Sequence, residues 1–213
     1  MTHPVDTILS LALLSVLFSL GTSHLTGLIR FVAFQGVVVS IVPFFIGHEM
    51  TGGGLLFTMV TLWIRGVVIP LSIYLVIKRV AIHREVEPII GYHASLFAGL
   101  VLIVAAFVVS YKLDVPLIMK SVLLIPTAIT ILVTGMFMLI ARRNAIAMVL
   151  GYIMMENGIY LVGTTFSTRA HRIVEFGILL DVLAGVMVMA IILQNIKQKF
   201  DVVDTAVLRT LKE

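Results

Sequence analysis

Four ionisable side chains, Arg65, Lys120, Glu156 and Asp181, stand inside stretches of the chain that are otherwise almost wholly apolar. An ionised side chain at the centre of a lipid bilayer costs roughly 2.5–3.5 kcal/mol on insertion scales, so each of them needs a physical reason to be there. Burial opposes the ionisation of a carboxyl group, and a nearby cation favours it. A carboxyl group balanced between these effects can take up and release a proton, which predicts proton transfer by Glu156 and Asp181.

The two acids are expected at comparable depths in neighbouring helices. At 1.5 Å per residue, Glu156 in "LGYIMMENGIYLVG" lies about 13 Å from one end of its helix, and Asp181 lies about 7 Å from the same side. We predict a carboxylate relay in which they exchange a proton directly or through water. Arg65 and Lys120 are candidates for tuning or extending this relay, with Glu156 as the expected partner of Arg65. Asn157 is expected to form a hydrogen bond between helices.

These residues also have structural interpretations, which the sequence leaves open. Arg65 could form an ion pair that only holds helices together, and Lys120 could extend its ammonium group to the membrane interface. Pro70 and Pro126 stand inside expected helices, where a proline removes a backbone hydrogen bond and tends to bend the helix.

The composition defines the class of protein that must position these residues. The chain has 213 residues, of which 60% are hydrophobic and 12% charged, and its mean hydropathy is +1.15. This balance excludes a soluble globular domain and indicates an integral membrane protein in a lipid bilayer. About 20 mainly apolar residues suffice for one membrane-spanning helix. We predict an all-α polytopic fold with seven transmembrane helices, at residues 5–20, 25–46, 55–77, 94–110, 116–141, 145–165 and 176–196.

The basic residues predict how these helices are oriented. Cytoplasmic loops carry an excess of Lys and Arg, and these residues gather in three regions that share one side if seven helices are present. The regions lie around 78–84, at 142–143 and after residue 196. The N-terminus is therefore expected outside and the C-terminus in the cytoplasm, in a bacterial or archaeal inner membrane. The loop near residues 82–88 suggests two modules, with four helices in 1–112 and three helices plus a short cytoplasmic tail in 113–213.

Several kinds of chemistry find no support in the sequence. There is no cysteine, which excludes thiolate metal sites. His48 and Glu49 lack a second histidine at metal-ligand spacing, and the Ser and Thr residues lack a partner base. We therefore expect no metal, no cofactor and no catalysis by this chain alone. The net charge of +4 lies mainly at segment ends, so we predict no binding of nucleic acid.

Two stretches carry a resemblance to a known family. "TGMFMLIARRNAIAMVLGYIMMENG", residues 134–158, and the tail "AIILQNIKQKFDVVDTAVLRTL", residues 190–211, resemble the three-helix subunit K of respiratory complex I and its relative in multisubunit antiporters. With four further helices in front, "ARRN" at 141–144 and "MENG" at 155–158, the chain resembles hydrogenase 4 component E. That family supplies a membrane subunit of group 4 nickel–iron hydrogenase and formate hydrogenlyase complexes.

The resemblance implies a function in a complex. The chain would be a membrane-arm subunit of a hetero-oligomeric, complex I-like hydrogenase, beside antiporter-like and other membrane subunits. Its buried acids would serve proton or sodium translocation coupled to redox chemistry in partner subunits. At the positions of the two acids of subunit K this chain has Ile153 and Ala184, and its own acids come three residues later and three residues earlier. A shift of three residues keeps nearly the same helix face.

Two other functions remain open from the sequence. The chain could be a structural scaffold of the membrane arm, whose buried charges only specify helix packing. It could also be a self-contained ion transporter, although its small size and lack of inverted repeats argue against this.

Overall fold

A computed structural model of the chain describes residues 4–46, 59–80, 89–113 and 121–166, and every regular element in these ranges is a helix. Five helices are long and apolar enough to cross a membrane, and a shorter apolar helix, Met59–Leu75, contains one π-helical turn. The elements are α1 (Pro4–Gly21), α2 (Leu25–Ile46), η1 (Ile64–Val68), α4 (Ile69–Val80), α5 (Tyr92–Lys112), α6 (Leu124–Ala141) and α7 (Ala145–Phe166).

The prediction of an all-α membrane protein is confirmed for this part of the chain. Five predicted spans correspond to α1, α2, α5, α6 and α7. The predicted span at 55–77 is described from residue 59, and the one at 176–196 lies outside the described residues. The count of seven spans and the orientation in a membrane stay predictions.

The expectation of a bend at Pro126 is wrong. Helix α6 begins at Leu124, not near residue 116, so Pro126 lies in its first turn. The first backbone N–H groups of a helix have no partner within it, and a proline there removes no intrahelical hydrogen bond. Helix α6 therefore accommodates Pro126 without interruption.

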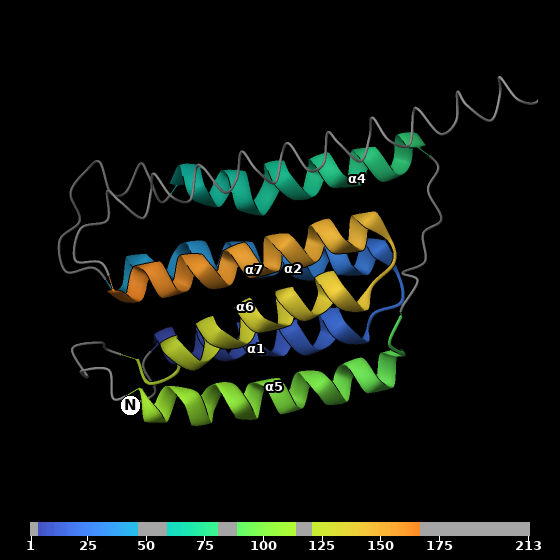
Figure 1. Ribbon diagram of the computed structural model, residues 1–213. Helices are drawn as coiled ribbons and strands as arrows, with labels where there is room; N and C mark the ends of the chain where they lie inside the picture. The colour runs from blue at the N-terminus through green and yellow to red at the C-terminus, as the bar shows by residue number, and fades with distance from the viewer. Residues whose placement is uncertain (1–3, 47–58, 81–88, 114–120, 167–213) are drawn as a thin grey trace, which may run out of the picture.

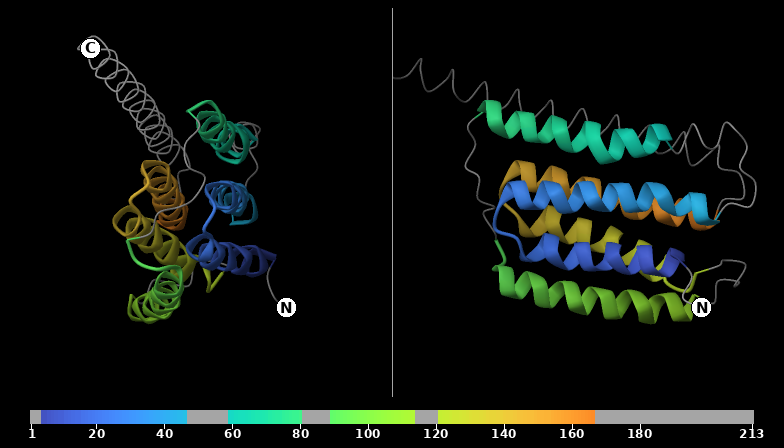
Figure 2. Two further views of the ribbon diagram at one scale, coloured as in Figure 1. Left: turned by 90° about the vertical axis from the view of Figure 1, so that its right-hand side faces the viewer. Right: turned by 180° about the vertical axis from the view of Figure 1, so that it is seen from behind.

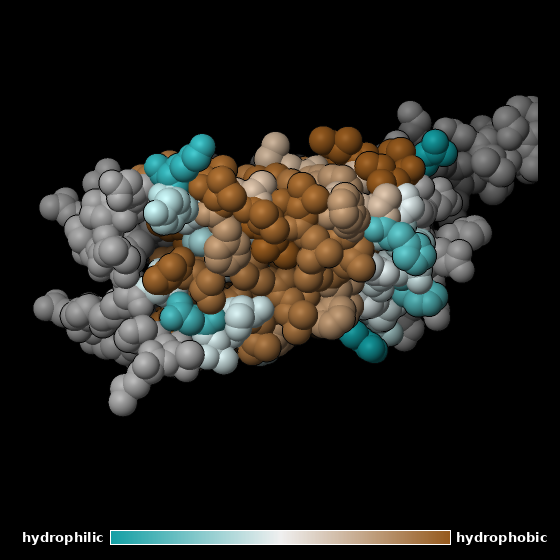
Figure 3. All heavy atoms as spheres, turned by 90° about the horizontal axis from the view of Figure 1, so that it is seen from below, coloured by the Kyte–Doolittle hydropathy of each residue, from teal (hydrophilic) through white to brown (hydrophobic). Residues whose placement is uncertain are grey.

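The helices run alternately up and down in one bundle (Figures 1 and 2). Helices α6 and α7 form a central hairpin, α1 and α2 pack beside it, α5 lies against α1 and α6, and η1 with α4 lies against α2. The short connections 22–24 and 142–144 lie at the same end of the bundle, where Arg142 contacts α1. On the face seen in Figure 3, apolar side chains form a broad band across the middle of the molecule, with hydrophilic residues toward both ends. This surface suits a multi-pass membrane protein.

Helices α6 and α7 approach so closely that only glycine fits at their contact. A Cβ atom on Gly135 would collide with the backbone nitrogen of Met155, and one on Gly158 would collide with the backbone nitrogen of Leu132. Small residues permit such contact in membranes, where backbone packing drives helix association. Of the five spanning helices, α7 is the most enclosed, with 72% of its apolar window buried. The acid in "MENG" therefore lies on the most protected helix among them.

Candidate functional site

The polar residues of "MENG" lie near the middle of α7 and are buried. Glu156 and Asn157 are each 1% exposed, although both are polar and their helix is otherwise apolar. Their burial inside an apolar bundle requires partners from another helix, because an unpaired buried charge is strongly unfavourable. The chain provides that partner from a segment far away in sequence.

Arg65 reaches the middle of the bundle from the π-helical turn η1. The N–H of Ile69 bonds to the carbonyl of Ile64, five residues earlier. Pro70 follows directly, and in a regular α-helix its ring would crowd the carbonyl four residues earlier. The wider π-helical turn relieves this crowding, and single π-helical turns occur frequently at functional sites. The sequence predicts that Pro70 tends to bend its helix, but it does not predict the π-helical turn.

Two glycines bring η1 close to α2. A Cβ atom on Gly36 would lie 3.1 Å from the carbonyl oxygen of Arg65, and one on Gly66 would lie 2.7 Å from the side chain of Val37. The close approach leaves Arg65 only 4% exposed. Its guanidinium group consequently extends inward, toward α7.

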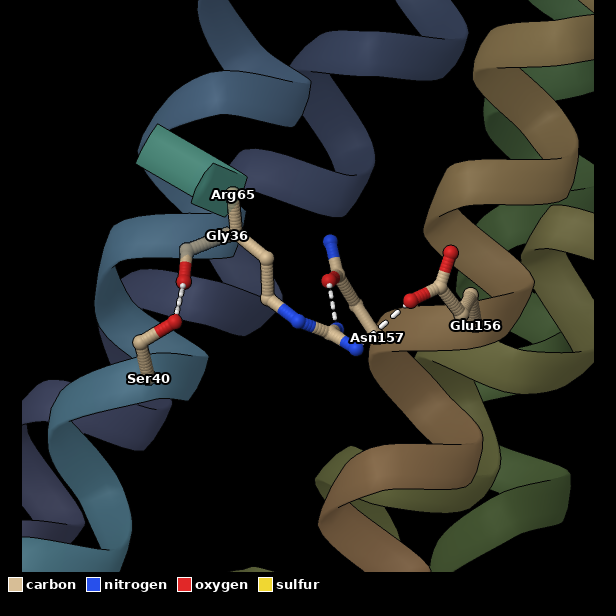
Figure 4. A network of polar contacts seen from close by, with 5 residues as sticks. All are labelled: Gly36, Ser40, Arg65, Glu156 and Asn157. Atoms are coloured by element: carbon tan, nitrogen blue, oxygen red, sulfur yellow. Dashed lines mark hydrogen bonds and ion pairs between the residues drawn. The ribbon is translucent and has the colours of Figure 1, made fainter. Parts of the chain in front are cut away.

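The guanidinium group contacts three side chains of α7, two of which, Glu156 and Asn157, are drawn in Figure 4. Arg65 Nη2 lies 2.5 Å from Glu156 Oε1, and Arg65 Nη1 donates a hydrogen bond to Asn157 Oδ1 at 2.9 Å. The Cζ atom of Arg65 lies 4.7 Å from the centre of the Tyr160 ring. A guanidinium group has five N–H donors in a planar fork, which lets it bind an acid and an amide at once.

This arrangement determines the electrostatic surroundings of Glu156. In a medium of low dielectric constant, a cation and an anion in direct contact attract each other strongly. Asn157 and Tyr160 provide neutral contacts to the same guanidinium group. The guanidinium group of Arg65 therefore has one acidic and two neutral partners on α7.

The structure brings together three of the five residues singled out from the sequence: Arg65, Glu156 and Asn157. Asn157 forms a hydrogen bond between helices, as expected. Lys120 and Asp181 lie outside the described residues, so the proximity of Asp181 to Glu156 stays a prediction. Within the described part of the chain, no group of three or more His, Cys, Asp or Glu residues could hold a metal ion.

Sequence reasoning missed a second buried arginine. From the sequence, Arg142 is expected only to help set the topology, but it is 1% exposed and donates a hydrogen bond from Nη2 to the carbonyl oxygen of Leu20 at 2.8 Å. Its Cζ atom lies 5.2 Å from the centre of the Tyr92 ring. Burial lowers the pKa of Arg142 from its ordinary value, and Tyr92 opposes this shift. Arg142 thus connects the ends of α1, α5 and α6.

The motif "ARRN" therefore has a structural explanation. Asn144 Oδ1 accepts a hydrogen bond from the N–H of Ile146 at 2.9 Å, which caps the first turn of α7. Arg143, between Arg142 and Asn144, is exposed. Two adjacent arginines thus have opposite environments, which hydropathy alone does not distinguish.

This pair provides a matched test of stability. Replacing Arg142 with alanine is expected to cost about 2–3 kcal/mol of unfolding free energy, because it removes a charged hydrogen bond to a helix end and a large buried side chain. Arg143→Ala should change the unfolding free energy by less than about 0.5 kcal/mol, as is usual at exposed positions. Denaturant unfolding of the detergent-purified protein measures both values. Equal effects of the two substitutions would contradict the stabilising contacts assigned to Arg142.

Comparisons with known proteins support the family resemblance for part of the chain. The uncharacterized protein Rv0085 of Mycobacterium tuberculosis is 26% identical over 194 residues, covering 89% of this chain and 87% of that protein. The hydrogenase-4 component E proteins of Escherichia coli K12 and Shigella flexneri are each 32% identical over 119 residues. About half of this chain resembles hydrogenase-4 component E.

The matches to component E are limited in extent. They cover 55% of this chain and 54% of each relative. No family model matches the chain. No solved structure matches it either. The similarity to component E supports that family, whereas the resemblance to complex I subunit K stays a prediction.

Proposed function

We propose that this chain is a membrane-arm subunit of a complex I-like hydrogenase complex in the inner membrane of a bacterium or archaeon. The partial similarity to hydrogenase-4 component E supports this proposal, and so do the five apolar helices. In this proposal the chain has seven spans, an outer N-terminus and a cytoplasmic C-terminus. Its modules are residues 1–112 and 113–213, and its neighbours are antiporter-like membrane subunits in a hetero-oligomer such as a formate hydrogenlyase.

The buried pair of Arg65 and Glu156 is the observation that carries the mechanism. Glu156 would be a carrier in a proton translocation path, or a sodium path, driven by redox chemistry in partner subunits. Asp181 would be the second carrier, and Lys120 would lie on the path or tune it. Arg65 Nη2 lies 2.5 Å from Glu156 Oε1, and a nearby cation favours the ionised form of a carboxyl group. A step that moves the guanidinium away would let the carboxylate bind a proton, and its return would expel that proton.

Asn157 and Tyr160 make this cycle physically reasonable. A buried guanidinium that loses its only partner is left as an uncompensated charge, at a cost of several kcal/mol. The Asn157 carbonyl oxygen and the Tyr160 ring contact Arg65 independently of the charge on Glu156. A cation over an aromatic ring gains about 2 kcal/mol when it is desolvated. These neutral partners would lower the energy of the state in which Glu156 is protonated.

The decisive experiment uses the intact complex in sealed vesicles. We expect the Glu156→Gln variant to assemble and to lose redox-coupled cation pumping, because glutamine keeps the shape of the side chain but cannot ionise. Assembly is checked on a native gel, and redox turnover and pumping are recorded together. Normal pumping by an assembled Glu156→Gln complex would refute the carrier function.

A double variant separates the carrier from the scaffold and the self-contained transporter. Arg65→Gln combined with Glu156→Gln removes both charges, so no buried charge is left without its partner. If the pair is only a scaffold, the double variant should assemble and keep coupled turnover and pumping. If Glu156 is a carrier, the double variant should assemble but should not pump. Pumping by the purified wild-type chain alone in vesicles would favour the self-contained transporter.

A further inference from the structure

One end of the bundle is rich in arginine. The connections 22–24 and 142–144 lie at this end together with the first turn of α5 (Figure 1). Arg142 and Arg143 stand in the second of these connections, and Arg30 lies in the second turn of α2, which begins at the same end. Arg142 is buried, whereas Arg30 and Arg143 are exposed. Two of the three guanidinium groups are therefore accessible at the surface.

No acid in the described ranges balances these charges. The ranges contain two acids, Asp6 in the first turn of α1, near the opposite end, and Glu156, whose ion pair lies at mid-depth. The contacts of the buried Arg142 are neutral, namely the carbonyl oxygen of Leu20 and the ring of Tyr92. Its Nε and Nη1 atoms have no hydrogen-bond partner among the described residues. Because salt screens a buried charge only weakly, Arg142 adds to the positive potential at the surface beside it.

The two exposed arginines are close in sequence to exposed apolar side chains. Phe34, four residues after Arg30, lies on nearly the same face of α2 and is 44% exposed. Ile140, in the last turn of α6 and three residues before Arg143, is 73% exposed. Each of these apolar residues lies nearer the middle of the bundle than its arginine. Both places therefore combine a cation toward the end of the bundle with an apolar surface toward its middle.

A ligand that matches both features carries an anionic group next to an apolar chain. A phosphodiester accepts charge-assisted hydrogen bonds from guanidinium groups, and an acyl chain covers apolar side chains. Anionic phospholipids have both parts, and basic residues near the membrane surface are attracted to them. An acidic segment of a partner protein would match the arginines but not the apolar surface beside them. The chemistry of this end of the bundle therefore favours a lipid.

We propose that Arg30 and Arg143 bind the headgroups of anionic phospholipids. The acyl chains of the same lipids contact Phe34 and Ile140. In the orientation proposed above, this end faces the cytoplasmic leaflet, whose surface potential is negative. The inference does not depend on ion translocation by the chain, because the surface lies at the end of the bundle, away from the buried ion pair.

Lipid binding is tested on the full-length chain purified in detergent. The chain is titrated with dioleoylphosphatidylglycerol, which is anionic, or with dioleoylphosphatidylcholine, which is zwitterionic, and native mass spectrometry gives the dissociation constants of the first lipids bound. Arg30→Gln and Arg143→Gln are made singly and together, since both side chains are exposed and their replacement leaves the core intact. Lys112→Gln is the matched control, because Lys112 is an exposed cation in the last turn of α5, at the opposite end.

We expect each arginine substitution to weaken the binding of phosphatidylglycerol about fivefold, the factor equivalent to about 1 kcal/mol for one basic residue near an anionic surface. Binding of phosphatidylcholine should be unchanged in every variant, because it depends on the apolar surface. Lys112→Gln should bind phosphatidylglycerol like the wild type. Arg143→Lys keeps the charge and should retain most of the affinity, which separates the loss of charge from a change in packing.

Four results would overturn the proposal. Wild-type affinity for phosphatidylglycerol in the variant that lacks both arginines would exclude these residues as the lipid site. An equal loss of affinity in Lys112→Gln would mean that binding follows net charge and not this surface. Displacement of phosphatidylglycerol by an equal concentration of inorganic phosphate would indicate a site for free anions. A wild-type chain without preference for phosphatidylglycerol, together with failure of the double variant to assemble into its complex, would assign the arginines to an acidic protein partner.

Discussion

Replacing Arg65 with methionine is expected to destabilise the folded chain by about 3–5 kcal/mol, the usual cost of removing one partner from a buried ion pair. Methionine fills much of the same volume and is apolar, so the loss of stability would not come from a cavity or from a buried polar group at position 65. It would come from Glu156, which is 1% exposed and would lose its cationic partner. The difference in unfolding free energy is measured by denaturant titration of the detergent-purified protein.

Two companion variants identify the cause of that loss. Arg65→Lys keeps the charge but cannot bind Glu156 and Asn157 through two arms of one planar group, so we expect an intermediate stability. Arg65→Met combined with Glu156→Gln removes both charges and should recover most of the loss. If the double variant is as unstable as Arg65→Met alone, the destabilisation does not arise from the unpaired carboxylate.

The contact between Arg65 and Glu156 could be anticipated from the sequence, because charges are rare and costly inside apolar helices. Few basic residues lie as deep in the predicted spans as Glu156, so few could be its partner. The position of Asn157 followed in the same way, as a polar residue beside the acid. Whether Arg65 would reach α7 could not be predicted, because that depends on the rotation of its helix, which the π-helical turn and Pro70 determine.

Arg142 shows where sequence reasoning was limited. Arg142 follows the end of α6, where a basic residue normally meets water or lipid headgroups. Its burial arises because the last turn of α1 lies beside it, where the backbone carbonyl of Leu20 has no partner within the helix.

The Arg65–Glu156 pair joins two unequal parts of the bundle. Glu156 lies on α7, whose backbone is in direct contact with α6 through Gly135 and Gly158. Arg65 lies on a segment that packs chiefly against α2 and has a π-helical turn in place of regular α-helix. Any motion that changes the distance between the charges is therefore more easily made by the Arg65 segment than by the α6–α7 hairpin. This asymmetry suits a mechanism in which the cation moves and the acid stays fixed.

Replacing Gly135 or Gly158 with alanine is expected to disrupt this hairpin, with a loss of about 3 kcal/mol or more in unfolding free energy. Overpacking a core usually costs about 1–3 kcal/mol, and it costs more where the obstacle is backbone that cannot change rotamer. The added Cβ atoms would meet the backbone of Met155 and of Leu132, respectively. Unfolding of the purified protein and its abundance in membranes both measure the effect.

Gly21 is the matched control for these glycines. A Cβ atom added there would meet only the Leu96 side chain, at 3.9 Å, which is ordinary van der Waals contact. Gly21→Ala should therefore leave the unfolding free energy within about 0.5 kcal/mol of wild type. If Gly135→Ala and Gly158→Ala behave like Gly21→Ala, the helices are not in backbone contact at these positions. A fixed position for Glu156 would then lack its physical basis, because the rigidity of α7 at mid-depth depends on this contact.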